Sequence, residues 1–199
     1  MSSSLKLGFL ASKNGSSFRA IVGAIRDGRL PAEPRLVVSN NRKSGALEFA
    51  AAVGVPHLWL PTERDPAAAD LALRDAMTSA GVELIVLSGY LRKLGPATLS
   101  RYRNRVINIH PGRLPEFGGE GMYGRRVHEA VIAAGVRVSG ATIHLVDEEY
   151  DRGPVLAQRD LPLDPGETVD SLEARITALE PLFFVETLLA VATGRLQLP

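Results

Sequence analysis

Asn108 and His110 lie two positions apart at the end of an apolar segment that Pro111 closes. The segment Arg105–His110 has the composition of a β-strand, in which alternate side chains share a face with Cβ atoms roughly 6–7 Å apart. An amide beside an imidazole can stabilise an oxyanion and move a proton near neutral pH. Taken alone, the pair also fits a strand end where Asn108 satisfies backbone groups and His110 is a core residue.

An acidic turn follows further along the chain, at positions 147–154. Such a turn is commonly a solvated loop, but it can also bring a carboxylate to His110, where it would raise the pKa of the imidazole. The chain has no cysteine, and Ser88-Gly89 lies outside any GxSxG pattern, so no nucleophile accompanies these residues. The nucleophile of a group transfer would then belong to the substrate. The other histidines lack metal-ligand spacing, and no metal is predicted.

The segment Ser12–Ser17 joins the first expected strand to the first expected helix. A helix N-terminus at this edge of a parallel sheet offers free N–H groups and a positive dipole end to an anion. Gly15 allows close approach of the backbone, and Ser16 and Ser17 add hydroxyl donors. The segment is neither GxGxxG nor a Walker A loop, so it favours one phosphomonoester over a dinucleotide or a nucleoside triphosphate. The alternative is a plain capping turn.

The first hundred residues alternate short apolar segments with segments of helical periodicity. The expected strands are Leu5–Leu10, Arg35–Ser39, His57–Leu60 and Leu84–Ser88. The expected helices are Phe18–Ile25, Ala46–Val53 and Ala67–Ser79. This alternation predicts an α/β fold, an open and mostly parallel twisted sheet with helices on both faces, because parallel strands need crossover connections that cover the sheet.

The second half follows a different pattern, with a glycine-rich loop, Gly112–Gly124, after the strand Arg105–His110. The remaining expected elements are a helix at Val127–Ala134, strands at Ser139–Val146 and Val155–Leu161, and a long helix from about Val169 to Ala192. The two strands are close in sequence and are expected to pair antiparallel. We expect one domain over 1–199, whose halves are 1–102, with the phosphate loop, and 103–199, with the Asn-x-His pair.

The composition excludes several classes of protein. The 199 residues are 45% hydrophobic, and 23 Lys and Arg balance 22 Asp and Glu. A formal net charge of +1 provides no long-range field for nucleic acid or anionic lipid, so neither is an expected partner. No apolar stretch approaches the ~18 residues of a membrane span, and the first apolar stretch is too short for a signal peptide. We expect a cytoplasmic protein.

Several motifs together resemble the folate-dependent formyltransferases. They are Asn14-Gly15-Ser16-Ser17, Asn108-Ile109-His110-Pro111 with Leu114-Pro115, Thr142-Ile143-His144, and Asp151-Arg152-Gly153-Pro154. The similarity covers nearly the whole chain and is greatest to the members of purine synthesis. It implies transfer of a formyl group from 10-formyltetrahydrofolate to the amine of 5′-phosphoribosylglycinamide, without a metal.

The resemblance also implies roles for individual residues. Asn108, His110 and Asp151 match the family's catalytic residues: Asn108 and protonated His110 would stabilise the tetrahedral oxyanion, and Asp151 would keep His110 charged and assist proton transfer. The acceptor's phosphate would bind at Gly15, Ser16 and Ser17, and Glu180 would contact its glycinamide end. The formyl folate would bind between two segments of the chain and would also contact Asn108. The first segment consists of Leu91, Arg92, Lys93 and Leu94, and the second of Asp147, Glu148, Glu149, Tyr150 and Asp151.

Other readings remain open at this stage. A formyltransferase acting on another small amine, such as a sugar nucleotide, and a non-catalytic folate-binding relative are both compatible with the motifs. Methionyl-tRNA formyltransferase would need a further tRNA-binding domain, and formyltetrahydrofolate hydrolase a further regulatory domain, for which 199 residues leave no room. We expect small-molecule partners and a monomer or homodimer; the roles of Lys13 and of the loop Gly112–Gly124 are undetermined.

Overall fold

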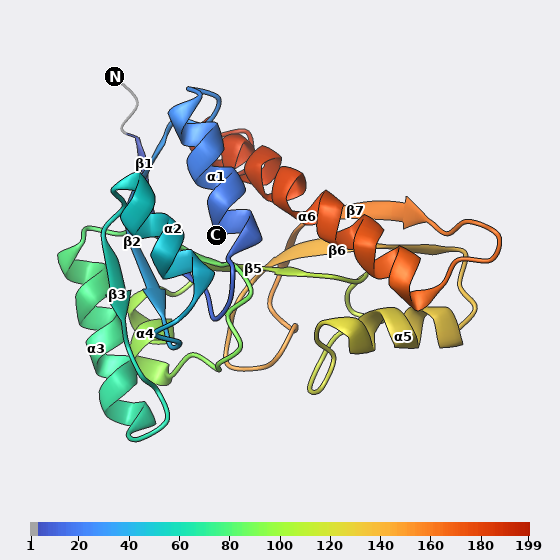
Figure 1. The fold of residues 1–199 in the computed structure, drawn as a ribbon, viewed down its shortest axis with the longest axis horizontal. Helices are drawn as coiled ribbons and strands as arrows, with labels where there is room; N and C mark the ends of the chain where they lie inside the picture. Colours follow the sequence, from blue (N-terminus) through green and yellow to red (C-terminus); the bar gives the residue numbers. More distant parts are fainter. Residues whose placement is uncertain (1–3) are drawn as a thin grey trace.

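The computed structural model describes residues 4–199, and in this part of the chain seven strands form one sheet in the order β3-β2-β1-β4-β5-β6-β7 (Figure 1). The elements are β1 (Leu5–Leu10), α1 (Ser16–Arg26), β2 (Ala32–Ser39), α2 (Gly45–Val53), β3 (His57–Trp59), α3 (Pro66–Ser79), β4 (Leu84–Leu87), α4 (Pro96–Arg101), β5 (Val106–His110), α5 (Arg125–Ala133), β6 (Val138–Leu145), β7 (Val155–Pro162) and α6 (Val169–Ala192). The predicted fold class is confirmed.

The sheet changes direction at β5. Strands β1 to β5 pair in parallel, as the alternation of strands and helices predicts. β6 pairs antiparallel with β7, as expected, and also with β5. In the β5–β6 register Asn108 is opposite His144 and His110 is opposite Thr142. Directly opposed residues share a face of the sheet, so this register adds a second imidazole to the Asn-x-His pair.

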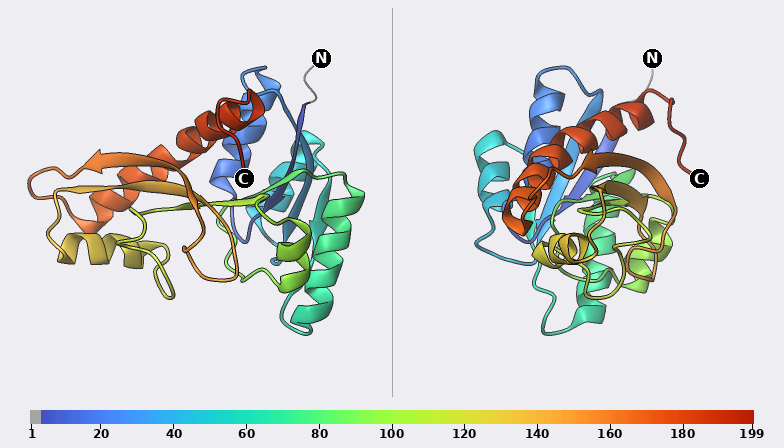
Figure 2. Two further views of the ribbon diagram at one scale, coloured as in Figure 1. Left: turned by 180° about the vertical axis from the view of Figure 1, so that it is seen from behind. Right: turned by 90° about the vertical axis from the view of Figure 1, so that its right-hand side faces the viewer.

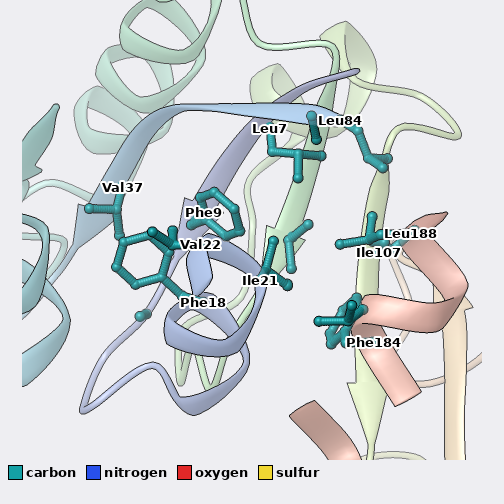
Figure 3. Packing of buried hydrophobic residues seen from close by; sticks show 14 of the residues in the cluster. Leu7, Phe9, Phe18, Ile21, Val22, Val37, Leu84, Ile107, Phe184 and Leu188 are labelled. Atoms are coloured by element: carbon teal, nitrogen blue, oxygen red, sulfur yellow. The ribbon is translucent and has the colours of Figure 1, made fainter. Parts of the chain in front are cut away.

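Helices cover both faces of the parallel part of the sheet (Figure 2). Figure 3 shows the side covered by α1 and α6, where Phe9 of β1 packs near Phe18 of α1 and Phe184 of α6 belongs to the same buried cluster. The next residue of β1, Leu10, points to the other face, into a cluster with Met77 of α3. Both faces of β1 are therefore buried, as its place between β2 and β4 requires. Full burial of a side chain such as Phe9 or Leu10 contributes roughly 1.5–3 kcal/mol to the free energy of unfolding.

A third apolar cluster supports the antiparallel end of the sheet. It joins α5 and the first turns of α6 to the glycine-rich loop through Phe117, Val127, Val131, Leu172 and Ile176. Helix α6 has 24 residues, about 36 Å at 1.5 Å per residue, and therefore packs against α5 at one end and α1 at the other (Figure 1). Its N-cap is Thr168, whose side chain accepts the N–H of Ser171, and it contains Pro181.

Helix α4 is the one element with no counterpart in the sequence prediction. Gly95-Pro96 reads locally as a turn, and only six helical residues follow. The carboxylate of Asp70, on α3, accepts hydrogen bonds from the backbone N–H groups of Ala97 (2.8 Å) and Thr98 (3.0 Å). Because this cap comes from another helix, the local sequence could not reveal it.

Candidate active site

The loops that follow β1, β4 and β5 meet at one edge of the sheet, where the carboxyl ends of neighbouring parallel strands lie together. The loop after β1 contacts the loop after β4, because the N–H of Ser12 donates to the carbonyl of Gly89 at 3.1 Å. The loop after β5 contains Phe117, whose carbonyl lies 2.6 Å from Nε2 of His110. The predicted phosphate loop and the Asn-x-His pair therefore lie at the same edge of the sheet.

His110 and Asp151, 41 positions apart, are neighbours in the structure. Nδ1 of His110 is 3.4 Å from Oδ2 of Asp151, and the side chains are 3% and 11% exposed. A carbonyl oxygen only accepts, so Nε2 of His110 carries the proton that it donates to Phe117. Its Nδ1 therefore faces the carboxylate and is the atom at which His110 gains or loses a proton.

Burial and charge act on His110 in opposite directions. Burial lowers the pKa of the imidazole, whereas the charge of Asp151 and the hydrogen bond to Phe117 raise it; burial has the larger effect, and the net pKa lies below 6.5. Asp151 thus acts on the His110 pKa in the expected direction, but in the free protein the effect of burial is larger. The physical reason is that the imidazole is almost fully buried.

Asp151 is held in its ionised form by its surroundings. Burial would raise its pKa, but the adjacent imidazoles of His144 and His110 and the N–H of Gly119 together lower it below the usual value. Gly119 donates to Oδ2 at 3.1 Å. Asp151 adopts the left-handed conformation, φ 56°, and a Cβ on Gly118 would come within 3.0 Å of its Cβ. The glycine-rich loop is thus shaped around this carboxylate.

His144 is a site residue that our sequence analysis did not assign. Its Nδ1 donates to the carbonyl of Leu145 at 2.9 Å, so the neutral ring presents Nε2 as an acceptor to Nδ2 of Asn108 at 3.2 Å. The same Nε2 is 3.5 Å from Oδ1 of Asp151. His144 therefore orients the amide of Asn108 and lies beside the carboxylate of Asp151. In the sequence, Thr142 and His144 stand at alternate positions of an expected strand, which places both on one face of the sheet. Only the β5–β6 register shows that this is the face of Asn108 and His110.

The second hydrogen on Nδ2 of Asn108 has no protein acceptor within residues 4–199. Asn108 is partly exposed beside buried His110. An amide hydrogen held in this way is available to a negatively charged oxygen. The structure thus brings together an oxyanion donor, an imidazole and an ionised carboxylate.

The phosphate loop has the geometry of an anion site. Gly15, at φ 62°, precedes α1 and provides no side-chain cap. Phe18 donates its N–H to Oγ of Ser88 at 3.0 Å, and Arg19 donates to the carbonyl of Gly15 at 2.9 Å. The N–H groups of Ser16 and Ser17 have no acceptor in the described part of the chain. Two backbone donors and the positive end of α1 therefore remain for a ligand.

The side chains of this loop differ in exposure. Ser16 and Lys13 are exposed, whereas Ser17 is 2% exposed, so of the two serines Ser16 presents its hydroxyl more openly to a ligand.

Glu180 lies on the buried face of α6. At spacings of four residues this face contains Leu172, Ile176, Glu180, Phe184 and Leu188, of which the four apolar members are at most 1% exposed. Burial raises the pKa of Glu180 to about 7. It lies between the part of α6 that packs on α5 and the part that packs on α1. A carboxylate at a position of this kind has a stability cost that an apolar residue would not have.

The two predicted folate segments are joined by one contact. Nζ of Lys93 lies 5.3 Å from the ring centroid of Tyr150, and the second segment ends at Asp151, the neighbour of His110. A cavity of about 520 Å³ lies under the first segment, lined by Arg92, Lys93 and Leu94. Its other walls come from α3 and the β3–α3 loop and do not include the second segment, while Leu91 is 55% exposed.

Residues 4–199 contain no cluster of three His, Asp or Glu side chains that could hold a metal ion. No helix among them is long and apolar enough to cross a membrane.

The raised pKa of Glu180 makes the stability of the protein depend on pH. Because the native pKa of about 7 is above the ordinary 4.5, the native protein binds more protons than the unfolded chain in this interval, and stability falls as the pH rises from 4.5 to 7. Glu180→Gln is expected to be more stable than the wild type by ~1–3 kcal/mol at pH 8, with a much smaller difference at pH 5. Urea unfolding at both pH values measures this.

The control is Glu186→Gln on the same helix, whose side chain is 58% exposed and pairs with Arg159. It should show no such gain at pH 8. An equal effect of both substitutions, or a destabilised Glu180→Gln at pH 8, would contradict the burial of this carboxylate.

Comparison with known proteins places these features in a family. The family model described as formyl transferase matches residues 5–188. A phosphoribosylglycinamide formyltransferase of Bacillus subtilis is 36% identical over 177 residues, 88% of each protein. Another, of Mycobacterium tuberculosis, is 38% identical over 190 residues, 94% of this chain and 85% of the relative. The chloroplastic enzyme of Vigna unguiculata is 37% identical over 96% of this chain, which spans only 62% of that longer relative.

Solved structures agree with the sequence comparison. Glycinamide ribonucleotide transformylase 1 from Symbiobacterium toebii superposes with a TM-score of 0.89 at 32% identity, covering 100% of this chain and 92% of that one. A formyltetrahydrofolate deformylase from Pseudomonas syringae, at 21% identity and a TM-score of 0.88, shares the fold. From its sequence, its sheet and its Asn-x-His strand, this chain belongs to the formyl transferase family.

Proposed function

We propose that this protein transfers the formyl group of 10-formyltetrahydrofolate to the amine of 5′-phosphoribosylglycinamide, a step of de novo purine biosynthesis. The observation that carries the proposal is the meeting of Asn108, His110 and Asp151 on the same sheet edge as the free N–H groups of α1. The names of the bacterial relatives support this choice of acceptor. The chain supplies no nucleophile because the amine of the acceptor is the nucleophile.

In the proposed reaction the acceptor amine attacks the formyl carbon, forming a C–N bond and a tetrahedral intermediate with a negatively charged oxygen. The free hydrogen of the Asn108 amide and the imidazole of His110 stabilise this oxygen. The intermediate then collapses, the bond between the formyl carbon and N10 of the folate breaks, and a proton lost by the amine reaches N10. Tetrahydrofolate and the formylated amine are the products.

The buried state of His110 suits a proton carrier in this sequence. Its pKa below 6.5 makes the free protein's imidazole neutral at pH 7. A developing oxyanion beside the ring favours the protonated form, as does Asp151, which is already ionised. His110 therefore gains affinity for a proton as negative charge develops. His144 contributes by orienting the Asn108 amide beside the Asp151 carboxylate.

The acceptor would be held at its two ends. Its phosphate binds the N–H groups of Ser16 and Ser17 at the start of α1, where Gly15 lets the backbone approach. Its amine end lies towards Glu180, whose pKa of about 7 allows the carboxylate to accept a proton from an ammonium group. The folate lies between the segment Leu91–Leu94 and the acidic turn, which Lys93 and Tyr150 connect.

A panel of acceptor amines tests the proposal. Formation of tetrahydrofolate from 10-formyltetrahydrofolate is measured with phosphoribosylglycinamide, glycinamide without the ribose phosphate, and an amino-sugar nucleotide. Phosphoribosylglycinamide is expected to give a kcat/KM at least ~10³-fold above the others, because the phosphate site has a place for one monoester. Preference for the sugar nucleotide, or folate binding without transfer to any acceptor, would contradict the proposal.

The catalytic assignments predict two losses of activity. His110→Ala removes the proton carrier and Asp151→Asn removes the neighbouring charge, and each is expected to lower kcat by at least ~10²-fold. Stopped-flow absorbance of the folate measures kcat, and circular dichroism checks folding. The control is His57→Ala, an exposed histidine of β3 outside the site, which should keep full activity. Near wild-type turnover in either variant would refute that residue's role.

The phosphate loop predicts a selective effect on the acceptor. Gly15→Ala places a Cβ on a left-handed residue, 3.2 Å from the Cβ of Ala46, and shifts the N–H groups that follow. Its KM for the acceptor should rise by at least ~10-fold while the KM for the folate changes little. Gly28→Ala imposes the same backbone strain, φ 71°, in open space at the other end of α1 and should change neither KM. A shared effect of both variants would indicate strain alone.

A further inference from the structure

Two buried serines connect the loop after β1 with the loop after β4. Ser12 follows β1 and is 4% exposed, and Ser88 follows β4 directly and is 3% exposed. β1 and β4 are parallel neighbours, with Leu10 beside Leu87 at their ends. The two hydroxyls therefore lie at adjacent strand ends, beneath the loops that the proposed function gives to the two substrates.

The hydroxyl of Ser12 acts on the loop of the other substrate. Its Oγ accepts the backbone N–H of Leu91 at 2.8 Å and donates to Oδ1 of Asn40 at 2.7 Å. Donation to Asn40 fixes the hydroxyl hydrogen and leaves a lone pair directed at Leu91. Ser12 belongs to the acceptor's phosphate loop, yet its side chain holds the first residue of the segment Leu91–Leu94.

The hydroxyl of Ser88, which follows β4, binds the start of α1 in the loop region of the acceptor. Its Oγ accepts the N–H of Phe18 at 3.0 Å, in a buried contact 70 positions apart in the chain. Phe18 is the third residue of α1, directly after the two residues whose N–H groups remain free. Ser88 lies at the end of the strand that leads into the folate segment, yet its side chain caps the helix at which the acceptor's phosphate would bind.

We propose that Ser12 and Ser88 are positioning residues, each of which holds the binding segment of the other loop's substrate. Ser12, in the phosphate loop, positions the folate segment, and Ser88, at the start of the folate loop, positions the phosphate-binding start of α1. The proposal rests on the proposed function for the identity of the two ligands. Transfer requires the amine and the formyl carbon to approach to roughly 3–3.5 Å, and a small relative displacement of the loops would separate them. A direct, buried connection between the loops keeps that distance independent of the flexibility of either one.

The alternative is that each serine stabilises only its own loop. Ser12→Ala would then weaken binding of the acceptor, and Ser88→Ala binding of the folate. The proposal predicts the reverse assignment, which a general loss of stability cannot imitate. Each variant therefore contains its own control, since the ligand of its own loop should be affected less than the ligand of the other.

Calorimetric titration of the full chain tests the two assignments with ligands that cannot react, ribose 5-phosphate for the phosphate loop and tetrahydrofolate for the folate segment. Ser12→Ala should raise the Kd for tetrahydrofolate by ~5- to 30-fold and that for ribose 5-phosphate by less than ~3-fold. Ser88→Ala should show the opposite pattern with the same magnitudes. Ser139→Ala, which removes a fully buried hydroxyl from β6, should change neither Kd.

The proposal would be overturned if Ser12→Ala mainly weakened binding of ribose 5-phosphate and Ser88→Ala that of tetrahydrofolate. An unchanged Kd for the predicted ligand of either variant would overturn it as well. Hydrogen exchange in the wild-type protein provides a test that needs no variant. Ribose 5-phosphate should slow exchange at the amide of Leu91, and tetrahydrofolate should slow exchange at that of Phe18; absence of both effects would also overturn it. If each probe slows exchange at the predicted amide but the wild type fails to formylate phosphoribosylglycinamide, the proposed function fails, whereas the roles of Ser12 and Ser88 in connecting the two loops stand.

Discussion

The antiparallel pairing of β5 with β6 is the constraint on which the site depends. Its register sets His144 opposite Asn108 and sends the chain, at the end of β6, into the turn that contains Asp151. A slip of one residue would move Asn108 and His110 to the other face of the sheet and separate them from the carboxylate. The register is well determined because both strands are largely buried, with Ile107 and Leu145 paired in the core. Packing of apolar residues thus sets the geometry of the polar ones.

Two ionisable side chains lie where burial disfavours their charged forms, which lowers the stability of the folded protein. His110 is buried and Glu180 is half-buried, and this burial shifts their pKa values in opposite directions, each towards the neutral form. The neighbours of Glu180 on the same face of α6 are apolar and buried. Ile176 and Phe184, one turn to either side of Glu180, are each at most 1% exposed and anchor α6 to different clusters. Helix α6 can therefore carry a half-buried carboxylate, because the turns on either side of Glu180 are both packed in apolar clusters.

Sequence patterns predicted the strands and most helices because their periods follow burial directly, as the alternation of Phe9 and Leu10 shows. Two features needed the third dimension. Helix α4 starts with a cap from Asp70, 27 positions away, and His144 enters the site only through the β5–β6 register. The sign of the pKa shift of His110 was also beyond the sequence, since it is decided by the degree of burial rather than by the nearby carboxylate.

Burial also explains how neutral groups can serve a reaction that creates charge. In the free protein Asp151 is the ionised member of the site, whereas His110 is neutral at pH 7. In the proposed reaction the oxyanion is the charge that develops, and it forms where the amide of Asn108 is already oriented by His144. Protonation of His110 then becomes favourable only when the oxyanion is present. The low dielectric that disfavours the imidazolium in the resting protein strengthens its attraction to that oxyanion, so the same burial stabilises the transition state selectively.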